Sequence, residues 1–274
     1  MYINIKGELV DLSFPRVMGI LNLTPDSFYP RSRKQTEQEI ATRVNQLQAE
    51  GADFIDVGAF STRPGAALVT EEEETARLDF GLGILFREYP KAVVSVDTFR
   101  SEIALRCVEK YGVAMINDIS AGEMDDRMHT VVAQLKVPYI LMHLRGGALT
   151  MMQDTVYADL MKELFLYFSE KINALHLSGV TDIILDPGFG FSKNTEQNFL
   201  LMRELKEFRL FDLPLLVGIS RKTMIREALN CSVEESLNGT TVLNTFALLN
   251  GASILRVHDV KEAVESIRLL EKLH

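Results

Sequence analysis

The sequence predicts an α/β fold of the (β/α)8 barrel type, built by one domain that spans residues 1–274. Three observations predict it: apolar runs of strand length recur eight times, amphipathic segments lie between them, and no linker or low-complexity stretch divides the chain. Continuous apolar runs are typical of strands buried on both faces, as in a parallel sheet. An open, doubly wound sheet fits the same alternation, and periodicity alone does not separate the two architectures.

The predicted elements follow one another from end to end of the chain. The strands are Val17–Leu21, Phe54–Val57, Val93–Val96, Ala114–Ile116, Tyr139–Met142, Ile183–Leu185, Leu215–Gly218 and Ile254–Val257. The intervening segments combine polar and apolar residues at helical spacing. These helices are Glu37–Glu50, Glu71–Tyr89, Ser101–Tyr111, Tyr157–Leu177, Thr195–Phe208, Thr223–Leu229 and Val233–Asn250. The first strand is not followed by Gly-x-Gly-x-x-Gly, which argues against a dinucleotide-binding fold.

Polar residues stand at or next to the carboxyl ends of the predicted strands. They are Asn22, Asp56, Asp97, Asn117, His143, Asp186, Ser220 with Lys222, and Arg256 with His258. In a barrel these strand ends meet on one face, where active sites lie. A single Asp at a strand end is ordinarily a turn or cap residue. When all the predicted strand ends carry carboxylates, amides or cations, the pattern instead predicts one polar site.

Composition and charge exclude several classes of protein. The chain has 29 Lys and Arg against 38 Asp and Glu, which gives a formal net charge of −9 at pH 7. This acidic balance argues against a surface that binds nucleic acid or an anionic membrane, because both partners are polyanions. No apolar run approaches the roughly 18 residues of a membrane helix, and the N-terminus shows no signal-peptide pattern. We therefore expect a cytoplasmic protein. Two cysteines are too few for a disulfide framework.

Seven short segments at the strand ends carry the most specific signal. They read MGILNLTPDSF at 18–28, GADFIDVG and STRPG within 51–65, SVDT at 95–98, INDIS at 116–120, DPGFGF at 186–191, VGISRKT at 217–223 and LRVHDV at 255–260. Taken together and in this order, they resemble the dihydropteroate synthase family. The resemblance runs from about Arg16 to Val260. Each piece is weak alone, but seven in order with matching spacing are specific.

The resemblance implies a reaction, a cofactor and an assembly. The family is a set of transferases of folate biosynthesis with a pterin-binding (β/α)8 barrel, usually homodimeric and inhibited by sulfonamides. Its reaction joins 6-hydroxymethyl-7,8-dihydropterin diphosphate to 4-aminobenzoate and releases 7,8-dihydropteroate and diphosphate with Mg²⁺. Asn22 is the implied protein ligand of the metal, since Mg²⁺ commonly takes few protein ligands beside substrate phosphates and water.

The resemblance also assigns residues to the pterin. It places Asp97, Asn117, Asp186 and Lys222 in the pterin pocket, with apolar walls formed by Ile119, Met142 and Phe191. A pterin presents a guanidine-like edge of donors, which suits a buried carboxylate such as Asp186. Asn117 both donates and accepts, and Lys222 donates to the ring carbonyl oxygen and N5. Ordinary filling of the barrel is the alternative explanation for Ile119 and Met142.

Diphosphate and aminobenzoate contacts follow in the same way. The resemblance implies that diphosphate is bound by Asn22, Thr62, Arg63, Arg256 and His258. Arg side chains bind phosphate oxygens through paired hydrogen bonds, although Arg63 and Arg256 can also pair with carboxylates. The residues implied for 4-aminobenzoate are Thr62, Pro64, Phe191, Ser220 and Thr223, with simple helix capping as the alternative for the two hydroxyls that flank Lys222. The implied catalytic residues are Asn22, Asp97, Lys222 and Arg256.

Two departures from the family pattern lie in loops. After Ser27-Phe28 the family often continues with Ser-Asp-Gly-Gly, but this chain has Tyr29-Pro30-Arg31. Before the STRP segment the family often has Gly-Glu, but this chain has Ala59-Phe60. We expect the loops Asn22–Arg33 and Ala59–Ala67 to be mobile without ligand and to close over diphosphate. Two alternative functions stay open at this point: a pterin-dependent corrinoid methyltransferase and a non-catalytic pterin-binding paralogue.

Overall fold

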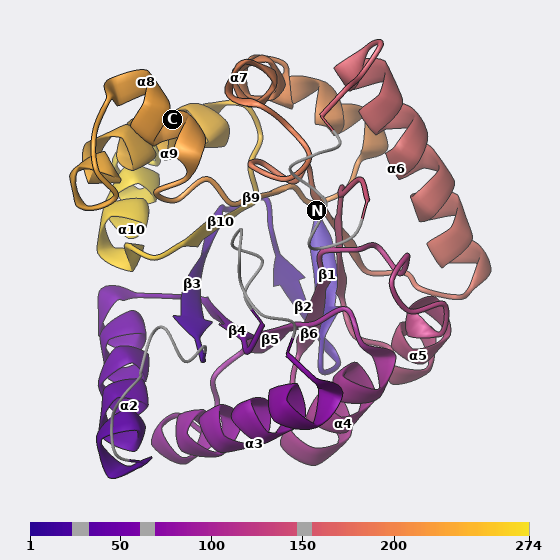
Figure 1. The fold of residues 1–274 in the computed structure, drawn as a ribbon, viewed down its shortest axis with the longest axis vertical. Coiled ribbons are helices and arrows are strands. Elements are labelled where there is room, and N and C mark those ends of the chain that lie inside the picture. The colour runs from indigo at the N-terminus through magenta and orange to yellow at the C-terminus, as the bar shows by residue number, and fades with distance from the viewer. Residues whose placement is uncertain (24–32, 61–68, 147–154, 274) are drawn as a thin grey trace.

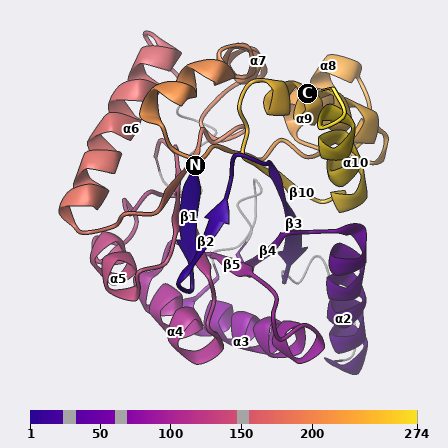
Figure 2. The same ribbon diagram turned by 180° about the vertical axis from the view of Figure 1, so that it is seen from behind.

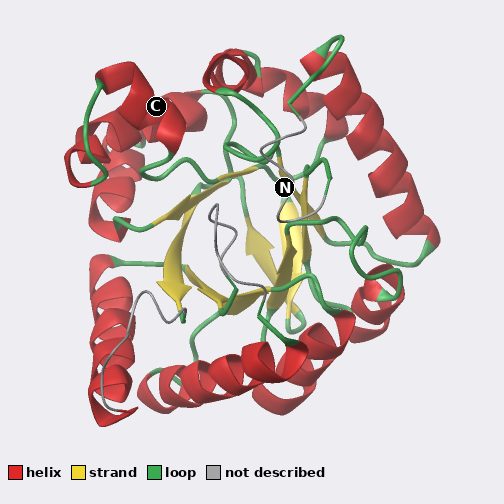
Figure 3. Cartoon of the chain, viewed as in Figure 1, coloured by secondary structure: helices red, strands yellow, loops and turns green. Residues whose placement is uncertain are grey.

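The structure is a computed structural model that describes residues 1–23, 33–60, 69–146 and 155–273. Eight parallel strands form one sheet in the order β8-β7-β6-β5-β4-β3-β10-β9, and helices surround it (Figure 1; Figure 3). The strands are β3 (Arg16–Asn22), β4 (Phe54–Gly58), β5 (Val94–Asp97), β6 (Met115–Asp118), β7 (Tyr139–Met142), β8 (Ile183–Asp186), β9 (Leu216–Val217) and β10 (Ile254–Val257).

The sheet closes on itself. A parallel bridge pairs Leu185 in β8 with Leu215, just before β9. The Leu185 amide also donates to the Pro214 carbonyl at 2.8 Å. The first and last strands of the sheet order therefore meet, which confirms the (β/α)8 barrel and excludes the open sheet.

A short hairpin, which is not among the predicted elements, closes the amino-terminal end of the barrel. Strands β1 (Tyr2–Ile5) and β2 (Glu8–Asp11) pair antiparallel and cross this end of the barrel (Figure 2). Lys6 and Gly7 both have positive φ, as the tight two-residue turns of hairpins require. Ile3 and Ile5 pack with the apolar residues at the bottom of the barrel and bury them.

The described helices are α2 (Arg33–Glu50), α3 (Glu71–Glu88), α4 (Ser101–Tyr111), α5 (Met128–Leu135), α6 (Leu160–Leu177), α7 (Thr195–Arg203), α8 (Thr223–Leu229), α9 (Leu237–Leu249) and α10 (Val260–Leu270), with 3₁₀ turns η1 (Leu205–Phe211) and η2 (Glu234–Ser236). Four predicted boundaries are wrong. Helix α2 begins at Arg33, four residues before the predicted Glu37. Helix α6 begins later than predicted because Asp159 caps it by accepting from the Lys162 amide. The predicted segments 195–208 and 233–250 each divide into an α-helix and a 3₁₀ turn. No helix in the described parts of the chain is both long and apolar enough to span a membrane.

The period of two along the strands separates the barrel interior into layers. The lower layer is apolar and consists of Met18, Phe54, Met115, Ile140, Ile184, Leu216 and Ile254, all buried in one cluster. The residues two positions later on the same strands also point into the barrel, nearer its carboxyl end, and Asp97 does so two residues after Ser95 on β5. They are Ile20, Asp56, Asn117, Met142, Asp186, Gly218 and Arg256. The polar residues therefore gather at the carboxyl end of the barrel.

Candidate active site

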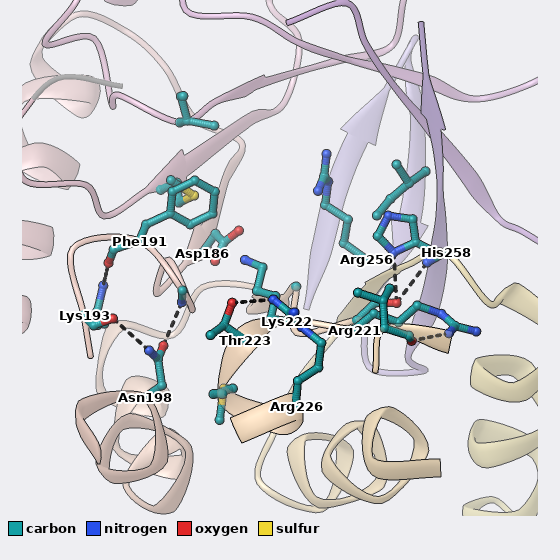
Figure 4. Close-up of a pocket in the computed structure, with 18 of the residues that line it drawn as sticks. Asp186, Phe191, Lys193, Asn198, Arg221, Lys222, Thr223, Arg226, Arg256 and His258 are labelled. Atoms are coloured by element: carbon teal, nitrogen blue, oxygen red, sulfur yellow. Dashed lines mark hydrogen bonds between the residues drawn. The ribbon is translucent and has the colours of Figure 1, made fainter. Parts of the chain in front are cut away.

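One pocket opens at the carboxyl ends of the strands (Figure 4). It is lined by all six residues expected to cluster there, Asn22, Asp97, Asn117, Asp186, Lys222 and Arg256. The other described candidates line it as well: Ile119, Met142, Phe191, Ser220, Thr223 and His258. Thr62, Arg63, Pro64 and most of the two loops predicted to close lie outside the described residues.

A guanidinium between two carboxylates forms the polar centre of the pocket. Arg256 Nε donates to Asp56 Oδ2 at 2.6 Å, and its Nη2 donates to Asp97 Oδ2 at 2.9 Å. Asn117 Nδ2 donates to the same Asp56 oxygen at 3.0 Å. Asp56 is fully buried, so its charge depends on these two donors. The two bonds use two of the five N–H donors of the guanidinium.

Burial and neighbouring charges shift the ionisation of this centre. Burial raises the pKa of Asp97 to about 7, and Asp56, Asp118 and Asp186 add to the rise, while Arg256 opposes it. Asp56, Asp97 and Asp186 hold the pKa of Arg256 above its usual value despite the burial of the guanidinium. The arginine therefore stays charged, and the Asp97 carboxylate gains or loses its proton near neutral pH.

The second polar group of the pocket is formed by Asp186 and Lys222. Asp186 accepts from the Gly188 amide at 2.8 Å, and burial raises its pKa. Lys222 Nζ donates to the Phe189 carbonyl and lies 4.4 Å from the centre of the Phe191 ring. Burial lowers the pKa of Lys222 to about 8, a shift that the Asp186 carboxylate opposes. The Asp186 carboxylate can thus accept two or more hydrogen bonds, and the Lys222 cation lies beside the aromatic face of Phe191.

An apolar wall completes the pocket. Ile119, Met142, Phe99 and Leu144 are buried in one cluster, against which Phe60 and Phe191 pack. The Phe60 and Phe99 rings meet edge to face at 5.5 Å. Phe60 lies at one of the two departures from the family pattern, where it adds a pocket-lining aromatic side chain in place of a carboxylate. A flat heteroaromatic ring fits between this wall and the polar centre.

His258 faces the pocket as a neutral side chain. Burial, together with the charge of Arg256, lowers its pKa to about 4. Ser220 Oγ accepts from the His258 amide at 3.2 Å and lies 3.1 Å from His258 Nδ1. We assign the Ser220 hydroxyl as the donor to Nδ1. The proton of the neutral ring then lies on Nε2, which can donate a hydrogen bond into the pocket. Arg43 donates to the His258 carbonyl at 2.6 Å and anchors this segment from α2.

The residues around Lys222 are held by contacts that short motifs do not reveal. Lys222 itself occupies the N-cap position of α8, so neither Ser220 nor Thr223 is the cap residue. Thr223 Oγ1 accepts from Arg226 Nη2 at 2.8 Å at the mouth of the pocket. Arg221, with a φ of 56°, makes a two-bond ion pair with Asp259 at 2.8 and 2.9 Å. That pair joins the turn before α8 to the start of α10.

Several residues of the site were missed by reasoning from sequence. The motifs assign no role to Asp56, although it lies two residues after Phe54 on the same strand and therefore points into the barrel. His143 was interpreted as a plain strand-end residue, yet it is bonded to the buried Lys193. No local pattern marks Lys193, since a lysine is exposed in most proteins.

Comparisons with known proteins agree with this geometry. Residues 18–258 match the family described as pterin binding enzyme. The dihydropteroate synthase of Escherichia coli (strain K12) is 41% identical over 268 residues, which cover 97% of this chain and 94% of that protein. The dihydropteroate synthase of Synechocystis is 39% identical over 260 residues, 94% of this chain and 89% of that one.

Solved structures show the same likeness in three dimensions. A Yersinia pestis dihydropteroate synthase in a sulfonamide drug complex matches with a TM-score of 0.90 and 36% identity over 100% of this chain and 99% of that chain. A Xanthomonas albilineans dihydropteroate synthase with 4-aminobenzoic acid matches with a TM-score of 0.90 and 34% identity over 99% and 97%. The chain therefore belongs to the pterin binding enzyme family, alongside the dihydropteroate synthases that it matches along nearly its whole length.

Proposed function

We propose that this protein is a dihydropteroate synthase that joins 6-hydroxymethyl-7,8-dihydropterin diphosphate to 4-aminobenzoate. The observation that carries the proposal is one pocket with two chemically different ends. Asp186 and Phe191 lie at one side of the pocket beside the apolar wall, and Arg256 and His258 lie at the other side (Figure 4). Asn117 lies between them, because it shares the Asp56 oxygen with Arg256. The first set suits a pterin, and the second suits an anionic leaving group.

The pterin is held by complementary donors and acceptors. The Asp186 carboxylate accepts from the donors around N3 and the 2-amino group. Asn117, already fixed by its bond to Asp56, offers its amide oxygen and second N–H to the mixed edge of the ring. Lys222 donates to the ring carbonyl oxygen and N5. A ligand that mismatches these groups leaves buried polar atoms unsatisfied, at a cost of about 1–3 kcal/mol each.

The reaction proceeds by loss of diphosphate before attack by the amine. Arg256 and the neutral His258 donate hydrogen bonds to the leaving group, together with Arg63 and Thr62 from the loop. The Asp97 carboxylate stabilises the positive charge that develops on the pterin and its methylene. The neutral arylamine then attacks that carbon and loses its proton. The protein supplies oriented charges rather than a nucleophile.

The donor set fits Mg²⁺ as cofactor. Among the described residues, no group of three or more His, Cys, Asp or Glu side chains is arranged to hold a metal ion. Asn22 would be the protein ligand of an ion held in this pocket, and the substrate diphosphate and water would supply the other ligands, a set that Mg²⁺ commonly takes. Asn22 ends β3 and lines the pocket. When bound, the ion neutralises negative charge on the departing diphosphate.

The second substrate binds at the outer part of the pocket. We assign the ring of 4-aminobenzoate to Phe191, Thr62 and Pro64, and its carboxylate to Ser220 and Thr223. A sulfonamide that resembles this substrate competes for the same place. The similar Xanthomonas albilineans structure is a dihydropteroate synthase with 4-aminobenzoic acid, and the similar Yersinia pestis structure is one in a sulfonamide drug complex. Both support the assignment.

Turnover of the two substrates, measured with and without Mg²⁺, tests the function directly. Dihydropteroate and diphosphate are expected in equal amounts, with a strong dependence on the metal. Asp97→Asn and Arg256→Ala are expected to lose most turnover while staying folded. Asp53→Asn is the control, because Asp53 accepts from Arg16 and the Val17 amide at the opposite end of the barrel. Full turnover by both site variants would overturn the assigned roles.

Two rival functions predict different results. A pterin-dependent corrinoid methyltransferase binds no diphosphate, so the Arg256–His258 end of the pocket favours the synthase. A non-catalytic paralogue binds the pterin without turnover. Product formation separates both from the proposed function, because neither releases diphosphate.

We also propose a homodimer formed through α9. Val242, Phe246 and Leu249 follow one another at helical spacing and are 58%, 40% and 54% exposed. An apolar stripe of this kind on an outer helix is typical of a protein–protein contact. Light scattering after gel filtration is expected to give a dimer for the natural chain and a monomer for Phe246→Glu. A dimeric Phe246→Glu protein would rule out this face.

A further inference from the structure

A buried lysine lies at the edge of the pocket and takes no part in the chemistry proposed above. Lys193 is only 1% exposed, and it ends the segment that begins at Asp186. Its Nζ donates to the Gly188 carbonyl at 3.1 Å and to the Phe191 carbonyl at 3.0 Å. The same atom lies 2.9 Å from His143 Nδ1 (Figure 4 shows its place below Phe191). Burial lowers the pKa of Lys193 to about 7, a shift that the Asp186 carboxylate opposes. In its protonated form Nζ has three N–H donors, and these contacts use all of them.

His143 provides a fixed acceptor for this lysine. The ring is 2% exposed, and burial together with the charge of Lys193 holds its pKa far below the usual value. A neutral ring accepts at Nδ1 and carries its proton on Nε2. Tyr167 meets the ring edge to face at 4.7 Å, and Tyr157 and Phe168 lie within 6.4 Å. These rings hold the imidazole in one orientation.

The segment that Lys193 spans has a backbone that needs such support. Gly188 has a φ of +71°, and a Cβ added there would lie 2.2 Å from the His143 carbonyl oxygen. Ser192 has a φ of +52°, which is unfavourable for a residue with a side chain. Conformations of this kind persist where surrounding contacts determine them. Lys193 provides two of those contacts from within the segment itself.

The same segment presents two groups to the proposed pterin site. The Gly188 amide orients Asp186 by donating to Oδ1, and the Phe191 ring packs on the pocket wall. We propose that Lys193 is a positioning residue: held by His143, its ammonium clamps the 186–193 segment so that Asp186 and Phe191 face the pterin. This inference rests on the proposed function for the identity of the ligand, and it adds two residues that touch no substrate.

Steady-state kinetics of Lys193→Met test the proposal. Methionine keeps the length of the side chain and removes all three hydrogen bonds. We expect KM for the pterin diphosphate to rise about tenfold or more, with kcat changed less than about threefold, because the loss falls on binding geometry. Asp53→Asn is the matched control, since it removes the charge and one of the two oxygens that accept from Arg16 and the Val17 amide at the far end of the barrel. It is expected to lower thermal stability and to leave KM unchanged.

A second pair of variants decides the question even where Lys193→Met fails to fold. His143→Asn retains an acceptor near the position of Nδ1, and His143→Leu removes it. We expect His143→Asn to keep KM within about threefold of the natural value and His143→Leu to raise it as Lys193→Met does. Equal KM values in this pair, or an unchanged KM in a destabilised Lys193→Met, would overturn the positioning role. If the natural protein shows no turnover, the proposed function fails. The dissociation constant of 6-hydroxymethylpterin, measured for the same variants, then decides the positioning role on its own.

Discussion

Replacing Arg256 with methionine removes the cation that separates two carboxylates. The guanidinium of Arg256 is 20% exposed, the Asp56 side chain is fully buried and the Asp97 side chain is 25% exposed. Methionine has similar bulk but donates no hydrogen bond. The variant therefore leaves two like charges inside the barrel, with Asn117 as the remaining described donor to Asp56.

The size of the effect follows from the two bonds that are lost. Each is a hydrogen bond between charged partners, at 2.6 and 2.9 Å, and such bonds contribute about 1.5–3 kcal/mol each. Removing one member of a buried ion pair costs about 3–5 kcal/mol in other proteins. We therefore expect Arg256→Met to lower the free energy of unfolding by about 3–5 kcal/mol at pH 8. That is a large share of a typical total of about 5–15 kcal/mol.

The cost is expected to shrink as the pH falls. The pKa of Asp97 is raised from 3.8 to about 7 in the folded protein, so the folded state binds this proton more tightly than the unfolded chain. Stability from that proton is lost as the pH rises between about 4 and 7. Arg256 lowers this pKa, so its removal raises the pKa further and extends the loss to higher pH. The difference between natural and variant protein is therefore larger at pH 8 than at pH 6.

Denaturation by urea, followed by far-ultraviolet circular dichroism at both pH values, measures this difference. Tryptophan fluorescence is no alternative because the chain contains no Trp. The double variant Arg256→Met/Asp97→Asn removes the stranded charge and is expected to regain at least about 1 kcal/mol. A cost below about 1 kcal/mol at pH 8, or a cost that grows as the pH falls, would refute the reasoning.

Three further predictions concern the loops of the pocket. Gly188→Ala is expected to lose about 2–4 kcal/mol of stability, because of the positive φ and the 2.2 Å contact with the His143 carbonyl. The control is Gly83→Ala in helix α3, where an added Cβ meets no described atom within 4 Å. Chemical denaturation should show that this control raises the free energy of unfolding by up to about 1 kcal/mol. In the natural protein 1/KM for the pterin diphosphate should fall above a pH of about 8 as Lys222 loses its proton, and Lys222→Met should raise KM about tenfold and remove this pH dependence. Calorimetric titration of 4-aminobenzoate should show weak binding alone and tighter binding with diphosphate and Mg²⁺, and equal affinities would mean that the loops are preformed.

Much of the site could be predicted from sequence because a parallel strand presents its functional residue at its carboxyl end. Asp97, Asn117 and Asp186 each follow or end a short apolar run, so their common face follows from the fold class alone. The period of two even separates the apolar layer from the inward-facing polar residues nearer the carboxyl end. Resemblance to a family then supplied the chemistry, since seven spaced motifs specify far more than any one strand.

Tertiary structure alone decided which partners these residues have. Closure of the barrel depends on the pairing of Leu185 with Leu215, and no local pattern records that register. Arg256 binds carboxylates that lie 200 and 159 positions earlier in the chain, and Lys193 binds a histidine 50 positions away. Hydrophobic periodicity reports whether a side chain is buried, but the identity of its neighbour depends on how distant strands and loops meet. The shifts in pKa and the contact of Lys193 with His143 arise from contacts between residues that are distant in the sequence. They can therefore be identified only in the folded chain.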